Sequence, residues 1–88
     1  MDTQLRSIIL NLQNRLSDDD RLRLHFFLGN HVPRSIRDDL TLRGTLSLMD
    51  NLFEQDKINE KDFHFLIEAL DSIQCFDAVK LLKGHFNS

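Results

Sequence analysis

The sequence contains no tryptophan and no tyrosine, and only one proline, three glycines and one cysteine among its 88 residues. Leucine is abundant whereas valine and threonine are scarce, and β-rich domains prefer the opposite balance. The single cysteine, Cys75, cannot form an internal disulfide, which excludes a disulfide-stapled scaffold and suits a reducing compartment. The composition therefore predicts an all-α protein.

Long hydrophobic runs and an excess of basic charge are also missing. No stretch approaches the roughly 18 to 20 apolar residues that span a bilayer, and Arg6 interrupts the N-terminal apolar segment. We expect neither a signal peptide nor a transmembrane helix. Fourteen acidic against eleven basic residues give a formal charge of -3, which provides no electrostatic footprint for nucleic acid or an anionic membrane. The prediction is a cytoplasmic protein, with the nucleus equally compatible, whose partners include no nucleic acid and no membrane.

The length and composition predict a single domain over residues 1–88. Apolar residues make up 41% of the chain and charged residues 28%, which is typical of a globular protein and not of a disordered one. A chain of this length can enclose one hydrophobic core but not two. We expect it to fold alone, with no internal repeat and no linker.

An apolar stripe predicts the first helix. Its members recur with the spacing of one helix face over about four turns, beginning at Asp2 or Thr3 as N-cap. The stripe consists of Leu5, Ile8, Ile9, Leu12 and Leu16.

A capping signal predicts the second helix. Ser17 is followed by three aspartates, which suit the unpaired N–H groups and the positive dipole end of a helix over residues 18–28. Gly29 and Asn30 are suited to a left-handed C-terminal cap, and Pro33 lies beyond them as a stop signal.

The rest of the chain predicts one short and three regular helices. Residues 34–41 have few apolar anchors and form either a short third helix or an irregular connector. A fourth helix is expected from Thr45 to about residue 55, a fifth after Asn59 as N-cap with Asp62 three residues later, and a last one from residue 75 or 76 to His85. Their apolar positions are Leu46, Leu48, Met49, Leu52, Phe53, Phe63, Leu66, Ile67, Leu70, Val79, Leu82 and Phe86, with Phe76 at the head of the last helix.

Several short motifs follow one another in an order seen in one known family. Asp20 opens the second helix, "LHFF" continues it at residues 24–27, and "NHVP" ends it at residues 30–33. The segments "EQDKI" at 54–58 and "FLIEALDSI" at 65–73 follow in the same order as in that family. Over essentially its whole length, the chain resembles a death effector domain, a subfamily of the death fold. The resemblance implies a six-helix antiparallel bundle of Greek-key type with a short third helix.

The second helix carries two adjacent phenylalanines. Successive helical side chains are about 100° apart, so Phe26 and Phe27 cannot both point toward the same face of the helix. Leu24, Phe27 and Leu28 can face the core, whereas Phe26 falls opposite, near Leu22. The resemblance implies that Phe26, together with Phe27, is a hydrophobic knob that docks into a groove on a neighbouring domain. The alternative is that Phe26 packs against another helix as ordinary core.

The resemblance also implies a surface charge triad, made by the acid of the second helix and an Arg-x-Asp-Leu motif at the last helix. Asp20 and Asp77 match the two acids, but Cys75 replaces the arginine and Ala78 the leucine. A guanidinium can hold two carboxylates at once, which a thiol cannot do. Either the surface of the triad is reorganised, or another basic residue takes the place of the missing arginine. The candidate bases are Arg21, Arg23 and Lys80.

The remaining chemistry-bearing residues give no catalytic or metal pattern. The histidines, at positions 25, 31, 64 and 85, form no metal-ligand pair with the spacing of a known site and are expected to be solvated or locally capped. Cys75 has no base beside it and is expected to be a buried small hydrophobe. The acids at 18–20 lack the ligands of a calcium loop. We expect no enzyme, no cofactor and no metal.

Three arginines, Arg34, Arg37 and Arg43, lie around the third helix among two aspartates. They form either a mixed solvated surface or half of an interaction patch, opposite in sign to the acids at 18–20. Opposite patches on one domain favour head-to-tail association, which generates a filament when it does not close.

The predicted function is a homotypic protein–protein interaction module. The resemblance implies that it binds itself, as a homo-oligomer or filament, or other death effector domain proteins such as a caspase prodomain or an adaptor in apoptotic or inflammatory signalling. The sequence does not distinguish between an adaptor, a protease prodomain and a decoy inhibitor. The alternatives are a pyrin-type or caspase-recruitment-type adaptor and a small helical nucleic-acid-binding domain, although the most basic stretch, residues 35–43, is diluted by two acids.

Overall fold

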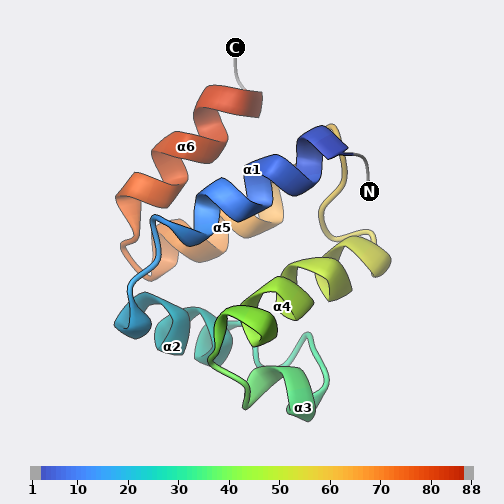
Figure 1. Cartoon of the computed structure of the whole chain (residues 1–88), viewed down its shortest axis with the longest axis vertical. Helices are drawn as coiled ribbons and strands as arrows, with labels where there is room; N and C mark the ends of the chain where they lie inside the picture. The colour runs from blue at the N-terminus through green and yellow to red at the C-terminus, as the bar shows by residue number, and fades with distance from the viewer. Residues whose placement is uncertain (1–2, 87–88) are drawn as a thin grey trace.

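The computed structural model describes residues 3–86, with only the backbone of Phe86 included. Within this range the chain forms six helices and no strand, apart from one isolated bridge between Asn59 and Asp62 (Figure 1). The predicted all-helical class is confirmed. The elements are α1 (Thr3–Gln13), α2 (Asp18–Phe27), α3 (Arg34–Arg37), α4 (Leu42–Glu54), α5 (His64–Ser72) and α6 (Phe76–Phe86).

The helices share one hydrophobic core. Helix α1 packs against α4 and α6, α2 packs against α4 and α5, and α5 packs against α6. Removing each leucine of this core from water contributes about 2 kcal/mol to folding. The predicted apolar stripes are largely buried, including the whole stripe of the first helix, although α1 ends at Gln13 and Leu16 follows it in a turn. The most deeply enclosed side chains include Leu12, Leu24, Leu48, Leu52, Phe63, Leu66, Leu70 and Leu82.

Some predicted apolar positions differ from this pattern. Phe76, at the head of α6, is half exposed. The side chain of Phe86 and the alternative N-cap Asp2 lie outside the described residues. No helix in the described part of the chain is long and apolar enough to cross a membrane.

The capping signal of α2 is confirmed at its N-terminus. The Ser17 hydroxyl accepts a hydrogen bond from the Asp20 N–H at 3.1 Å, and the Asp20 carboxylate accepts one from the Ser17 N–H at 2.9 Å. The predicted left-handed cap at Gly29 is wrong, because no described glycine has a positive φ. Helix α2 instead loosens into successive turns, in which Gly29 N–H donates to Phe26 O and His31 N–H donates to Leu28 O.

Helix α4 begins three residues earlier than predicted. Thr41 is its N-cap, and the Thr41 hydroxyl accepts from the Gly44 N–H at 3.3 Å. Thr45, the predicted start, is therefore already inside the helix and is fully buried. A threonine can cap a helix wherever its side chain meets a free N–H, and Thr41 does so here.

Helix α5 begins later than predicted, at His64. Asn59 does not cap it, because Asn59 and Asp62 close a tight turn by exchanging backbone hydrogen bonds at 2.9 and 3.2 Å. The Asp62 carboxylate accepts from the His64 N–H at 2.8 Å, so Asp62 makes the local contact that was predicted for Asn59.

Left-handed caps do occur, at the ends of α4 and α5. Asp56 has φ of 58° and Gln74 has φ of 64°. In each case the N–H of the next residue donates to the carbonyl five residues earlier, at 3.0 Å after Asp56 and 2.9 Å after Gln74. This is the Schellman arrangement, for which glycine is the usual residue.

The α3 segment, defined here as residues 34–41, contains both predicted alternatives. Its first half is the four-residue helix α3 and its second half is an irregular connector to α4. No residue of α3 is fully buried, and its N-cap is Pro33, whose side chain has no polar group that could cap the helix. In Figure 1 the segment lies at the periphery of the bundle, beside the N-terminal part of α4.

Candidate protein-interaction surfaces

Neither phenylalanine of α2 belongs to the core. Phe26 is 82% exposed and Phe27 is 50% exposed, whereas Leu24 and Leu28 are enclosed as predicted. The core alternative for Phe26 is therefore wrong, and so is the inward orientation of Phe27. Within α2 only Leu24 and His25 are buried, so both phenylalanines lie on the exposed side of the helix.

Phe26 stands on a surface formed by α2 and the α3 segment. A shallow hollow of about 430 Å³ lies beside it. Leu22, one turn before Phe26, is 53% exposed, and Leu40 of the α3 segment is 39% exposed. We call Leu22, Phe26 and Leu40 the knob surface. The hollow is lined by Leu22, His25, Phe26, Arg37, Asp38 and Leu40.

Phe27 contributes to a different hollow, between α2 and α5. The ring of Phe65 lies there with His31 packed edge-on against it, the ring centroids 5.2 Å apart, and with the Lys57 ammonium 5.1 Å from its centroid. Glu68 adds a carboxylate to the lining. The adjacent phenylalanines therefore serve two separate surfaces, and only Phe26 protrudes almost completely.

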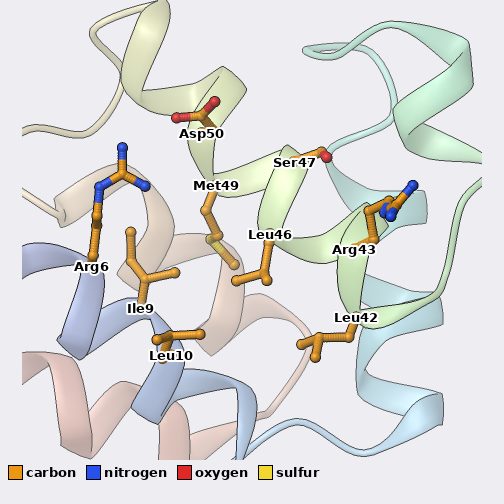
Figure 2. A pocket seen from close by; sticks show the side chains of 9 residues that line it. All are labelled: Arg6, Ile9, Leu10, Leu42, Arg43, Leu46, Ser47, Met49 and Asp50. Atoms are coloured by element: carbon orange, nitrogen blue, oxygen red, sulfur yellow. The ribbon is translucent and has the colours of Figure 1, made fainter.

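A larger apolar groove of about 540 Å³ lies between α1 and α4. Figure 2 shows side chains of both helices meeting across it, with Arg6 and Asp50 near one end and Leu42 near the other. Leu10 and Leu42 are 56% and 51% exposed. The apolar lining consists of Ile9, Leu10, Leu42, Leu46 and Met49, and the polar lining of Arg6, Arg43, Ser47 and Asp50.

This groove was not predicted from the sequence. Leu10 was the available signal, because it is an apolar residue outside the core stripe of the first helix. Leu42 gave no signal, because the fourth helix was expected to begin after it. An apolar groove of this kind is a candidate binding surface for a protruding hydrophobic side chain.

The structure brings together Asp20 and Cys75, two positions of the charge triad implied by the resemblance. Cys75 is buried, as predicted, and its thiol donates to the Arg15 carbonyl at 3.5 Å. Burial raises the pKa of the Cys75 thiol, and the neighbouring Asp20 and Asp77 carboxylates raise it further. The thiol is therefore a protonated, packed group and not a clamp for the two acids.

Asp20 is occupied within its own helix cap. The hydrogen bond from the Ser17 backbone N–H is the largest cause that lowers the pKa of the Asp20 carboxyl, and the positive charge of Arg23 lowers it slightly more. Arg21 turns elsewhere, donating to the Gln13 carbonyl at 3.4 Å and lying 3.8 Å from Asp18. Of the candidate bases, Arg23 is the one whose charge acts on Asp20.

Arg34 and Arg37 both pair with Asp38 inside the α3 segment. The Nε atoms of Arg34 and Arg37 lie 3.5 and 3.3 Å from the Asp38 carboxylate. The pairs are exposed, so each contributes little to stability. Asp39 accepts hydrogen bonds from the Thr41 N–H and hydroxyl, which lower the pKa of the Asp39 carboxyl. The charges predicted for an interaction patch thus partly neutralise one another.

The expectation that all the histidines are solvated or locally capped is wrong for His25. Its side chain is only 1% exposed and its ring bonds two other segments of the chain. His64 is exposed, and its Nε2 atom lies 2.9 Å from the Oε1 atom of Glu68. Among residues 3–86 no three His, Cys, Asp or Glu side chains gather as a metal site would require.

Comparisons with known proteins find no match to this chain among models of protein families, curated proteins or solved structures. The resemblance to the death effector domain family therefore rests on the residues of the chain itself.

Proposed function

We propose that this chain is a death-effector-type interaction module, with the antiparallel six-helix arrangement of the death fold, and that its copies associate by placing Phe26 of one in the α1–α4 groove of the next. One observation carries the proposal: a phenylalanine that is 82% exposed and an apolar groove of about 540 Å³ occur on different elements of the same small domain. An exposed aromatic side chain that fills a pocket is the usual energetic centre of a protein interface.

Charges on the two surfaces support a second copy as the occupant. Asp19 is exposed and lies on the side of α2 that carries Leu22 and Phe26, three and seven residues before them. Arg6 and Arg43 are exposed in the lining of the groove, which also contains one acid, Asp50, so the lining carries a net positive charge. Opposite charges around an apolar contact speed association and fix its orientation. Beside the knob, Arg37 and Asp38 pair with each other. Each copy therefore offers an apolar knob with the acid Asp19 beside it and an apolar groove with a net basic lining.

The geometry of such a contact determines the kind of assembly. The knob surface belongs to α2 and the α3 segment, whereas the groove belongs to α1 and α4. A contact between two different patches is heterologous, so it continues from copy to copy unless it closes into a ring. Polymerisation then concentrates whatever the module is attached to or recruits, such as a caspase-type protease or its adaptor.

Sedimentation velocity over a range of protein concentrations, with negative-stain microscopy, tests the proposal. The wild-type protein is expected to form assemblies that grow with concentration. Phe26→Asp and Leu10→Asp should each stay monomeric, because one loses the knob and the other the groove. Phe76→Asp is the matched control, since it removes a half-exposed phenylalanine from another part of the surface, and it should assemble like wild type.

Mixing the two monomeric variants gives the sharpest result. Phe26→Asp keeps its groove and Leu10→Asp keeps its knob, so an equimolar mixture should form pairs that grow no further. A wild-type protein that is monomeric at every concentration, or assembly that survives both substitutions, would disprove the knob-and-groove contact.

A further inference from the structure

A buried histidine joins three elements of the fold beneath the knob surface. The Nδ1 atom of His25 lies 3.1 Å from the backbone oxygen of Ile36 in α3, and the Nε2 atom lies 3.0 Å from the Thr45 hydroxyl oxygen in α4. His25 itself belongs to α2 and directly precedes Phe26. Its ring is almost fully enclosed, although the residues that line the hollow beside Phe26 include it.

The partners of the ring fix its tautomer. A backbone carbonyl can only accept a hydrogen bond, so Nδ1 must carry a proton and donate to Ile36. In the neutral ring Nε2 then has no proton and accepts from the Thr45 hydroxyl. Both ring nitrogens are therefore used, and the Nδ1–H group is the side of the ring that holds the α3 segment.

The other attachments of the α3 segment are only partly buried. Helix α3 packs against α4, and Ile36 lies half-buried against the hydrophobic core. The helix is four residues long and buries no side chain completely. The irregular half touches α4 through the backbone of Asp39, which passes over Gly44. A segment with few buried apolar contacts opens at low free energy, so one buried hydrogen bond strongly affects how often it is closed.

We propose that His25 is a positioning residue for the knob surface: its Nδ1–H bond to Ile36 holds the α3 segment against α2 and thereby keeps Leu40 beside Leu22 and Phe26. The effect on assembly rests on the proposed function, whereas the effect on the α3 segment does not. A partner that meets an open segment must order it on binding, and that conformational cost weakens the contact without removing Phe26.

The first test needs only the wild-type protein. Nitrogen-15 NMR of the imidazole at neutral pH should identify His25 as the Nδ1–H tautomer, with a ring proton that exchanges slowly with water. A ring protonated only at Nε2 would overturn the proposal, because that tautomer has no proton to donate to Ile36.

The second test measures amide hydrogen exchange in His25→Leu. The backbone N–H groups of residues 37, 38 and 39 donate to the carbonyls of Pro33, Arg34 and Ile36. They should exchange about tenfold faster, while the N–H groups of α1 and α5 change much less. Leu24→Ala is the matched control, because it removes a buried side chain from the same helix. It should speed exchange throughout the domain and not selectively in the α3 segment.

Thr45→Val provides a milder variant that keeps the Nδ1–H bond and removes only the hydroxyl that orients the ring. The backbone amide protons of its α3 segment should exchange at a rate between those of wild type and His25→Leu. Unchanged exchange of residues 37–39 in a folded His25→Leu protein would overturn the proposal.

Sedimentation then separates the two proposals. His25→Leu is expected to assemble about tenfold more weakly than wild type while still containing Phe26. If the segment opens but assembly is unchanged, the positioning role is wrong although the knob-and-groove contact stands. If wild type does not assemble at all, the proposed function fails, and the exchange and tautomer results still decide whether His25 holds the α3 segment.

Discussion

Gly44 allows the backbone of Asp39 to pass directly over helix α4. A Cβ atom at position 44 would clash with the Asp39 carbonyl oxygen and would lie 2.6 Å from its carbonyl carbon. The contact is made by backbone atoms, which cannot rotate away as a flexible side chain can. This close approach sets the path of the connector between α3 and α4.

Gly44→Ala is therefore expected to destabilise the domain by about 1–3 kcal/mol, in the range of overpacked sites, despite the higher helix propensity of alanine. Urea unfolding followed by circular dichroism measures the effect. Gly84→Ala is the matched control, because no atom lies within 4 Å of a Cβ at that position in α6. It should stabilise the protein by about 0.5–1 kcal/mol. Equal effects of the two substitutions would contradict the close approach.

Gln74→Gly is expected to stabilise the protein by about 0.5–1 kcal/mol, because glycine adopts the left-handed conformation at the end of α5 without a steric cost. Gln74 is exposed, so little packing is lost. Gln74→Ala keeps the steric cost and should change stability by less than half as much. Thermal unfolding of the three proteins checks this, and a destabilised Gln74→Gly variant would show that the conformation is not strained.

Asp20→Asn tests the pH dependence of the α2 cap. Hydrogen bonding lowers the folded-state pKa of Asp20 from its ordinary value of 3.8, so the charged carboxylate stabilises the fold above that value and loses this effect as the pH falls through the folded pKa. The variant should be less stable than wild type at pH 7, by about 0.5 kcal/mol as for a charge at a helix N-terminus. Urea titrations at falling pH should show the difference shrinking in acid. A difference that persists unchanged at the lowest pH would mean that it does not come from the charge.

Cys75 is expected to react slowly with a neutral alkylating reagent at pH 8. Burial and the two nearby carboxylates raise the pKa of its thiol, and only the thiolate is nucleophilic. Mass spectrometry should find the native protein alkylated much more slowly than the same protein in urea, which is the internal control. Equal rates would show that the thiol is accessible and ionised in the folded state.

Local sequence signals predicted the elements that depend on neighbouring residues. The leucine stripes identified the buried faces, and Ser17 with Asp20 identified the cap of α2, because capping joins groups three residues apart. Where two local signals competed, the prediction failed. Thr45 was predicted to begin α4, but Thr41 caps it, and Asn59 was predicted to cap α5, but Asp62 accepts the hydrogen bond from the His64 N–H.

The candidate surfaces depended on contacts between distant segments. Phe27 was expected to face the core because the helical angle allowed it, but angle alone does not say which neighbouring helices cover a face. His25 was expected to be solvated or locally capped, because its hydrogen-bond partners Ile36 and Thr45 lie eleven and twenty residues away in the sequence. The α1–α4 groove likewise exists only because two separate helices meet.

The sequence by itself determined that the chain is helical, where most helices lie and which leucines they bury, because periodicity and capping act within a few residues. Only the tertiary structure decided that Phe26 stands free, that Phe27 borders a second hollow and that His25 ties the α3 segment to the bundle. Exposure and long-range hydrogen bonds are properties of how helices cover one another, and that arrangement has no signature within a single helix.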